Sequence, residues 1–146
     1  METLPKLSKT IVIEAPVEKV FAYVDKPAHL PEIWPSLFEV KDVETFPDGG
    51  YRFAWFYNMA GKRIGGETAT YERVVNKRLV EKAEGDLRTM LTWTFHGENG
   101  KTKIDLEADY ELPKELFATG DELFVTRFNE HEAETVLANL KTKLEI

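Results

Sequence analysis

Cysteine is absent from this chain of 146 residues. The protein therefore has no disulfide bond, no thiolate ligand for a metal and no thiol nucleophile, and packing alone must stabilise its fold. Long apolar runs are missing too: no stretch approaches the roughly 18 consecutive apolar residues of a transmembrane helix. The first six residues lack the charged start and apolar run of a signal peptide. We therefore expect a cytoplasmic protein with no integral membrane segment.

Positive charge is scarce, because 19 Lys and Arg stand against 26 Asp and Glu, for a net charge of −7. No basic run marks a phosphate-binding surface, so nucleic acid is not an expected partner. Phosphate-binding glycine loops, dinucleotide fingerprints and nucleophile elbows are also missing. The three histidines, His29, His96 and His131, lie on three separate predicted elements without the i, i+4 pairing typical of metal ligands. We expect no metal and no other cofactor.

Hydrophobic residues make up 42% of the chain and aromatic residues 12%, which suffices for the core of one domain. No linker or repeat divides the chain, so residues 1–146 are interpreted as a single domain. Residues 7–15 alternate between apolar and polar side chains with many β-branched residues, which predicts a strand. Pro16 then suits the first turn of a helix over residues 17–24. A second short helix is predicted over residues 28–33.

From Phe38 onward the sequence indicates one hairpin after another. Turn residues recur at intervals of about one strand, which leaves no room for crossover helices, so the six strands should form an antiparallel meander. In three of these strands apolar and aromatic residues share one face, and in the last strand charged residues such as Glu107 and Asp109 share the opposite face. One face of the sheet should be buried and the other exposed to water. The turn signals lie at residues 47–50, 60–62, 76–77, 84–86 and 99–100.

The C-terminal segment has no Pro or Gly after Gly120, and Thr119–Glu122 has the spacing of a capping box, which predicts one long helix to Ile146. Its second half presents an apolar stripe typical of core: Ala133, Val136, Leu137, Leu140 and Leu144. Its first half mixes rings with polar groups, in Phe124, Phe128, His131 and Thr135. We expect that mixed surface to face a partly filled space.

The order of these elements, together with one segment, resembles the START-like superfamily, also called the SRPBCC or polyketide cyclase/dehydrase and lipid-transport group. The segment is Ile11–Phe21, with an Ala-Pro helix start, followed by Asp25, Leu30, Trp34 and Pro35. The resemblance implies an α+β helix-grip fold. In that fold a curved seven-stranded antiparallel sheet wraps around a long C-terminal helix, with two short helices after the first strand. It also implies a cavity between sheet and helix.

The leading functional hypothesis is therefore binding or carriage of a hydrophobic small molecule, such as a lipid, quinone or polyketide-like compound, in that cavity. Tyr57 and His131 are candidates to orient the ligand through hydrogen bonds. We expect the protein to be a monomer or weak homodimer. The candidate ligand-binding residues are Trp34, Phe53, Trp55, Tyr57, Trp93, Phe95, Phe124, Phe128 and His131.

Two alternatives remain open at this point. The first is a cyclase or dehydratase in which His131 or an inward carboxylate moves a proton; Glu67 and Glu81 lie in strands of uncertain register, and either could point inward with a raised pKa. The second is a protein-interaction module that uses Phe56 on the outer face of the sheet. No catalytic residue is assigned by the sequence.

Overall fold

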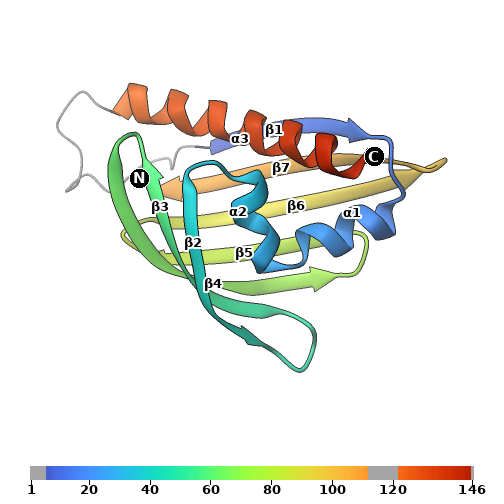
Figure 1. The fold of residues 1–146 in the computed structure, drawn as a ribbon, viewed down its shortest axis with the longest axis horizontal. Coiled ribbons are helices and arrows are strands. Elements are labelled where there is room, and N and C mark those ends of the chain that lie inside the picture. The colour runs from blue at the N-terminus through green and yellow to red at the C-terminus, as the bar shows by residue number, and fades with distance from the viewer. Residues whose placement is uncertain (1–5, 112–121, 146) are drawn as a thin grey trace.

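The computed structural model describes residues 6–111 and 122–145 and confirms the predicted helix-grip arrangement (Figure 1). One strand and two short helices come first, then a six-stranded meander and a long helix. The predicted capping box begins at Thr119, and its residues Thr119–Asp121 lie outside the described residues. The elements are β1 (Lys6–Ile13), α1 (Val17–Val24), a short 3₁₀ turn (Pro27–His29), α2 (Leu30–Ile33), β2 (Leu37–Thr45), β3 (Tyr51–Met59), β4 (Lys62–Val74), β5 (Arg78–Gly85), β6 (Arg88–Glu98), β7 (Lys101–Glu111) and α3 (Glu122–Leu144).

The seven strands form one antiparallel sheet in the order β1-β7-β6-β5-β4-β3-β2. The five hairpins of the meander turn where the sequence predicted. Gly49, Gly61, Asn76 and Asn99 take positive φ angles of 96°, 87°, 64° and 52° in four of these turns. Glycine and asparagine tolerate that left-handed backbone best, which is why the turns could be recognised from the sequence.

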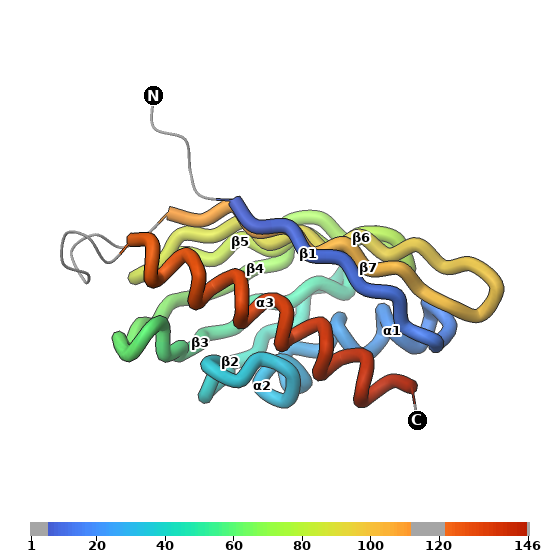
Figure 2. Tube along the Cα trace, turned by 90° about the horizontal axis from the view of Figure 1, so that it is seen from above, coloured from blue at the N-terminus to red at the C-terminus, as the bar shows by residue number. Residues whose placement is uncertain are grey.

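The sheet is strongly curved, and all the helices lie on its concave side (Figures 1 and 2). Helix α3 lies alongside β1 and packs on it and on α2. Strands β2 and β3 curve round toward the helices from the other end of the sheet. No helix in the described part of the chain is long and apolar enough to cross a membrane.

Buried side chains on α3 form one continuous stripe along the helix. The prediction of which residues of the first half face the sheet is therefore wrong. The apolar stripe of the second half is confirmed, since its five residues are all buried. In the first half, however, the stripe continues through Val125, Asn129 and Glu132, not through the phenylalanines. Residues four apart share a helix face, so Asn129 and Glu132 continue the line of Val136 and Leu140. Their polarity concealed this face in the sequence.

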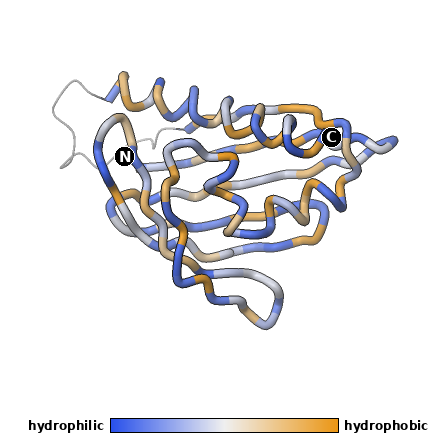
Figure 3. Tube along the Cα trace, in the orientation of Figure 1, coloured by the Kyte–Doolittle hydropathy of each residue, from blue (hydrophilic) through white to orange (hydrophobic). Residues whose placement is uncertain are grey.

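Two apolar clusters fill the space between sheet and helices. The larger joins α1 and the second half of α3 to strands β1, β5, β6 and β7 around Trp93 and Ile104. The smaller joins β3 and α2 to the start of α3 around Trp55 and Val125. Hydrophobic and hydrophilic residues alternate along the chain in the strands and in α3, as one-sided burial requires (Figure 3).

Two leucines of α3 provide a matched test of this helix orientation. Leu140 is 0% exposed in the larger cluster, whereas Leu123 is 61% exposed. Leu140→Ala should lower the free energy of unfolding by about 2–5 kcal/mol, because it removes buried methyl groups and leaves a void. Leu123→Ala should change it by no more than about 0.5 kcal/mol. Urea denaturation of both variants measures this difference, and equal losses would contradict the orientation.

Candidate functional site

A cavity of about 150 Å³ lies between the sheet and α3, and side chains of both clusters line it. Its floor is a row of small residues on three adjacent strands. Thr68 of β4 pairs with Ala83 of β5, and Ala83 pairs with Thr89 of β6. Further along β5 and β6 the inward residues are Leu79 and Trp93, and these large side chains fill the space between sheet and helices as part of the core. The cavity exists where the inward side chains become small.

Glycine at position 66 sets one wall of the cavity. A Cβ on Gly66 would lie 2.7 Å from Cζ2 of Trp55 and 2.3 Å from the backbone oxygen of Glu84. Only glycine therefore lets the Trp55 ring lie this close to β4. The bulge of β4 occurs further along the strand, between Thr70 and Glu72, while the pairing with β3 is continuous through Gly66.

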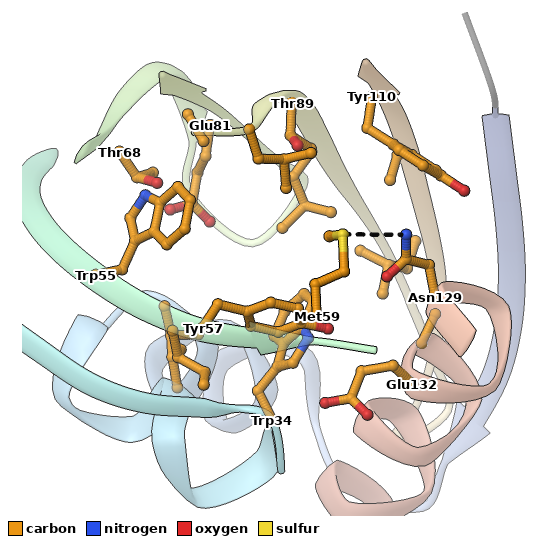
Figure 4. A pocket seen from close by; sticks show the side chains of 18 of the residues that line it. Trp34, Trp55, Tyr57, Met59, Thr68, Glu81, Thr89, Tyr110, Asn129 and Glu132 are labelled. Atoms are coloured by element: carbon orange, nitrogen blue, oxygen red, sulfur yellow. Dashed lines mark hydrogen bonds between the residues drawn. The ribbon is translucent and has the colours of Figure 1, made fainter. Parts of the chain in front are cut away.

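The structure brings four of the nine predicted ligand-binding residues to the cavity. Trp34, at the end of α2, lines it together with three residues of β3: Phe53, Trp55 and Tyr57. Figure 4 shows Trp55 at one end of the cavity, with Tyr57 and Trp34 lying side by side below Met59. Burial raises the pKa of Tyr57 above its usual range, and the charge of Glu132 adds to this shift, so Tyr57 keeps its proton.

Trp93 and Phe95 do not line the cavity, contrary to the prediction, because both are packed into the larger cluster. Trp93 stacks on Phe95 at 6.4 Å and meets the edge of Trp34 at 6.4 Å. Phe95 in turn meets the edge of Phe21 at 5.3 Å. These rings support the wall that Trp34 forms, but they lie behind it.

The three predicted residues of α3 also lie outside the cavity lining. Phe124 is 63% exposed, His131 is exposed, and Phe128 is half-buried against the smaller cluster. The expectation that His131 points into the cavity is therefore wrong. Asn129, Glu132 and Ala133 take that place, because they lie on the buried stripe of the helix.

Glu81 of β5 is the one residue among the two uncertain carboxylates that points inward. It lines the cavity and is 7% exposed, whereas Glu67 is exposed on the outer face. Burial raises the pKa of Glu81 to about 7; the charge of Asp25 adds to the rise, and the Trp93 indole opposes it. Asp25 is itself held by Arg73, whose Nη2 lies 2.7 Å from Oδ2. The alternation of Leu79, Glu81 and Ala83 along β5 is the signal that would have placed Glu81.

Two further polar side chains reach the cavity from α3. Glu132 is buried, and its Oε1 accepts a hydrogen bond of 2.7 Å from the backbone N–H of Ser36. Asn129 is also buried, and its Nδ2 lies 3.9 Å from the sulfur of Met59 (Figure 4). A contact of that length to a thioether is a weak hydrogen bond, so the Asn129 amide has capacity for another partner.

Several buried polar atoms of the cavity residues have no hydrogen-bond partner within the described residues. They are Nε1 of Trp55, Oγ1 of Thr89 and the hydroxyl of Tyr110. Buried polar atoms in proteins nearly always have a partner, in the protein, in water or in a ligand. Three such atoms belong to residues that line one cavity, where water or a bound molecule could complete their hydrogen bonds.

The other two histidines are engaged elsewhere. Nδ1 of His29 lies 2.9 Å from the backbone oxygen of Tyr23, and Nε2 of His96 lies 3.2 Å from Oδ2 of Asp105. In residues 6–111 and 122–145, no group of three or more His, Cys, Asp or Glu side chains could hold a metal ion.

The order of elements, and the cavity between the curved sheet and the long helix, agree with the comparison to known protein families. The model of the family described as polyketide cyclase/dehydrase and lipid transport matches residues 5–145. The chain belongs to this family. It is thus a member of the START-like, or SRPBCC, superfamily, whose shared feature is a ligand-binding cavity. No curated protein matches the chain significantly.

Solved structures of low sequence identity share the fold. TTHA0849 from Thermus thermophilus is 22% identical, with a TM-score of 0.83 over 96% of this chain and 97% of the other. A START superfamily protein from Mycobacterium smegmatis is 16% identical, with a TM-score of 0.79 over 96% and 97%. The Zhui aromatase/cyclase from a Streptomyces species is 13% identical, with a TM-score of 0.78 over 97% and 94%.

The buried Glu81 should make stability depend on pH. Its pKa is about 7 in the fold against an ordinary value of 4.5, so between these values the native state binds more protons than the unfolded state. Stability then falls as pH rises through this window, by about 3 kcal/mol in total. Glu81→Gln removes the titration, so the variant should gain that amount relative to the natural protein between pH 4 and pH 8.

Urea denaturation across this pH range measures the effect, and Glu84→Gln on the exposed face of β5 is the matched control. The control should follow the natural protein at every pH. A stability difference between Glu81→Gln and the natural protein that is constant with pH would show that Glu81 titrates normally.

Proposed function

We propose that this protein binds or carries an apolar small molecule in the cavity between the sheet and α3. The observation that carries the proposal is the cavity itself, which combines aromatic walls from Trp34, Phe53 and Trp55 with a few buried polar atoms that lack partners among the described residues. A mostly apolar lining supplies affinity, and a few convergent polar groups fix orientation.

The cavity volume restricts the part of the ligand that it encloses. An apolar protein cavity of about 150 Å³ accommodates one benzene molecule, and this cavity has the same volume. The enclosed part of a ligand is therefore about the size of an aromatic ring or a short branched chain, and a larger ligand would extend beyond this volume.

Glu81 supports a second candidate, an enzyme of the cyclase or dehydratase type. A carboxyl group with a pKa of about 7 can both donate and accept a proton near neutral pH. It lies in the cavity wall, where a bound molecule would meet it. Turnover of a polyketide-like substrate that disappears in Glu81→Gln, with binding retained, would favour the enzyme over the carrier.

The interaction-module hypothesis has weaker support. The Phe56 ring stacks on Phe38 at 6.2 Å, and the amine of Lys41 and the guanidinium of Arg63 lie 5.0 and 5.5 Å from its centre. Phe56 is thus covered in part by its own neighbours, although Phe38 is 48% exposed. The state of monomer or weak homodimer stays a prediction.

Filling the cavity tests the proposal. Ala108 of β7 lines the cavity, so Ala108→Leu should occupy part of its volume and lower the affinity for naphthalene at least about fivefold in equilibrium dialysis. Ala54→Leu makes the same change on the outer face of β3 and should leave naphthalene binding unchanged. Native mass spectrometry of the protein as purified should show a bound small molecule that is lost on denaturation. Equal naphthalene binding by the two variants would contradict the cavity site.

A further inference from the structure

The acidic groups of the cavity have no basic counterpart in the described lining. Glu81 and Glu132 both line it, from the sheet and from the facing helix. Within residues 6–111 and 122–145, no lysine, arginine or histidine contributes to the lining. Arg73, which is near Asp25, makes three hydrogen bonds of 2.7 to 3.2 Å with the Asp25 carboxylate and is thereby engaged.

A carboxylate ligand would therefore meet two acidic side chains and no cation from the described residues in an apolar space. A buried anion is stable only when it is paired or hydrogen-bonded by several donors. Many apolar ligands, fatty acids among them, carry a carboxylate. The absence of a cationic partner in the described lining therefore disfavours these acids relative to uncharged apolar molecules.

The polar atoms at one end of the cavity define what a ligand must offer. Trp55, Thr68 and Glu81 come from the adjacent strands β3, β4 and β5 and gather at that end (Figure 4). Nε1 of Trp55 can only donate, and it has no partner among the described residues. The Glu81 carboxyl can accept a hydrogen bond, and when protonated it can also donate one.

A hydroxyl group satisfies both requirements at once. Its oxygen can accept the hydrogen bond from Trp55, while its own hydrogen is donated to Glu81. An ammonium group could donate to Glu81, but it has no lone pair with which to accept from Trp55. Resting on the proposed function, we infer that the ligand is an uncharged molecule whose enclosed ring carries a hydroxyl group, held by Trp55 and Glu81, and that carboxylates are rejected.

Four probes that share one ring system test this inference: naphthalene, 2-naphthol, 2-naphthoate and 2-naphthylmethylammonium, each titrated by calorimetry at pH 7. We expect 2-naphthol to bind most tightly and its affinity to exceed that of 2-naphthoate at least about tenfold, because 2-naphthoate places an unpaired anion in a cavity whose described lining holds two acids and no base. Tighter binding of 2-naphthylmethylammonium than of 2-naphthol would overturn the assignment of a hydroxyl group. Naphthoate or naphthalene binding as tightly as naphthol would overturn the inference and leave the proposed function intact. If no probe binds, the proposed function fails with it.

Glu81→Gln separates the charge of Glu81 from its shape, since an amide keeps a donor and an acceptor. At pH 8, where Glu81 is mostly ionised in the natural protein, the variant should raise the affinity for 2-naphthoate relative to that for 2-naphthol at least about fivefold, while Glu84→Gln should leave this ratio unchanged. An unchanged ratio of the two affinities in Glu81→Gln would overturn the role of Glu81.

The natural protein provides a readout that depends on no variant. As pH rises from 6 to 8, Glu81 loses its proton while the charge of Asp25 acts on it, and Glu132 lines the same cavity. Affinity for 2-naphthoate should fall at least about threefold over this range, while 2-naphthol, which like a tyrosine phenol stays un-ionised there, should change less. A naphthoate affinity independent of pH would contradict the inference.

Discussion

The concave face of the seven-stranded sheet is unstable in water, because most of the side chains that point to it are apolar or aromatic. Packing of α3 against that face is the contact on which the remaining structure depends. It seals the larger cluster through Val136, Leu140 and Leu144, all of which are 5% exposed or less. The same helix, further toward its start, carries Asn129 and Glu132 over a space that its side chains do not fill.

Core and cavity follow from the sizes of the residues that face this helix. Where the inward rows carry Leu79 and Trp93, the space closes. Where they carry Thr68, Ala83 and Thr89, it stays open. Because interiors otherwise pack at the density of organic crystals, an open volume of this kind costs stability. Glu81 adds to that cost, since its burial disfavours the charged form. Both features are consistent with a site that function retains.

The polar atoms give this cavity its chemical character more than the aromatic walls do. Rings such as Trp34 and Phe53 supply apolar contact that many ligands would find favourable. The N–H of Trp55 favours a ligand that can accept a hydrogen bond, because it has no partner among the described residues. Glu81 and Glu132 disfavour an anionic ligand, because both acids line the same cavity. The family fold supports this arrangement, but it does not set these residues.

Local patterns in the sequence determined the strands, the turns and the fold. Period-two alternation and Gly or Asn turn residues depend only on neighbours along the chain, so the inward positions of Phe53, Trp55 and Tyr57 could be predicted. The phase of α3 could not, because Asn129 and Glu132 are polar and buried, and hydrophobicity pointed to Phe124 and Phe128 instead. Which aromatic residues are wall and which are core, as with Trp34 and Trp93, was decided only by the tertiary structure. A cavity depends on the sizes of residues brought together from several strands and a distant helix. No single segment of the chain contains that information.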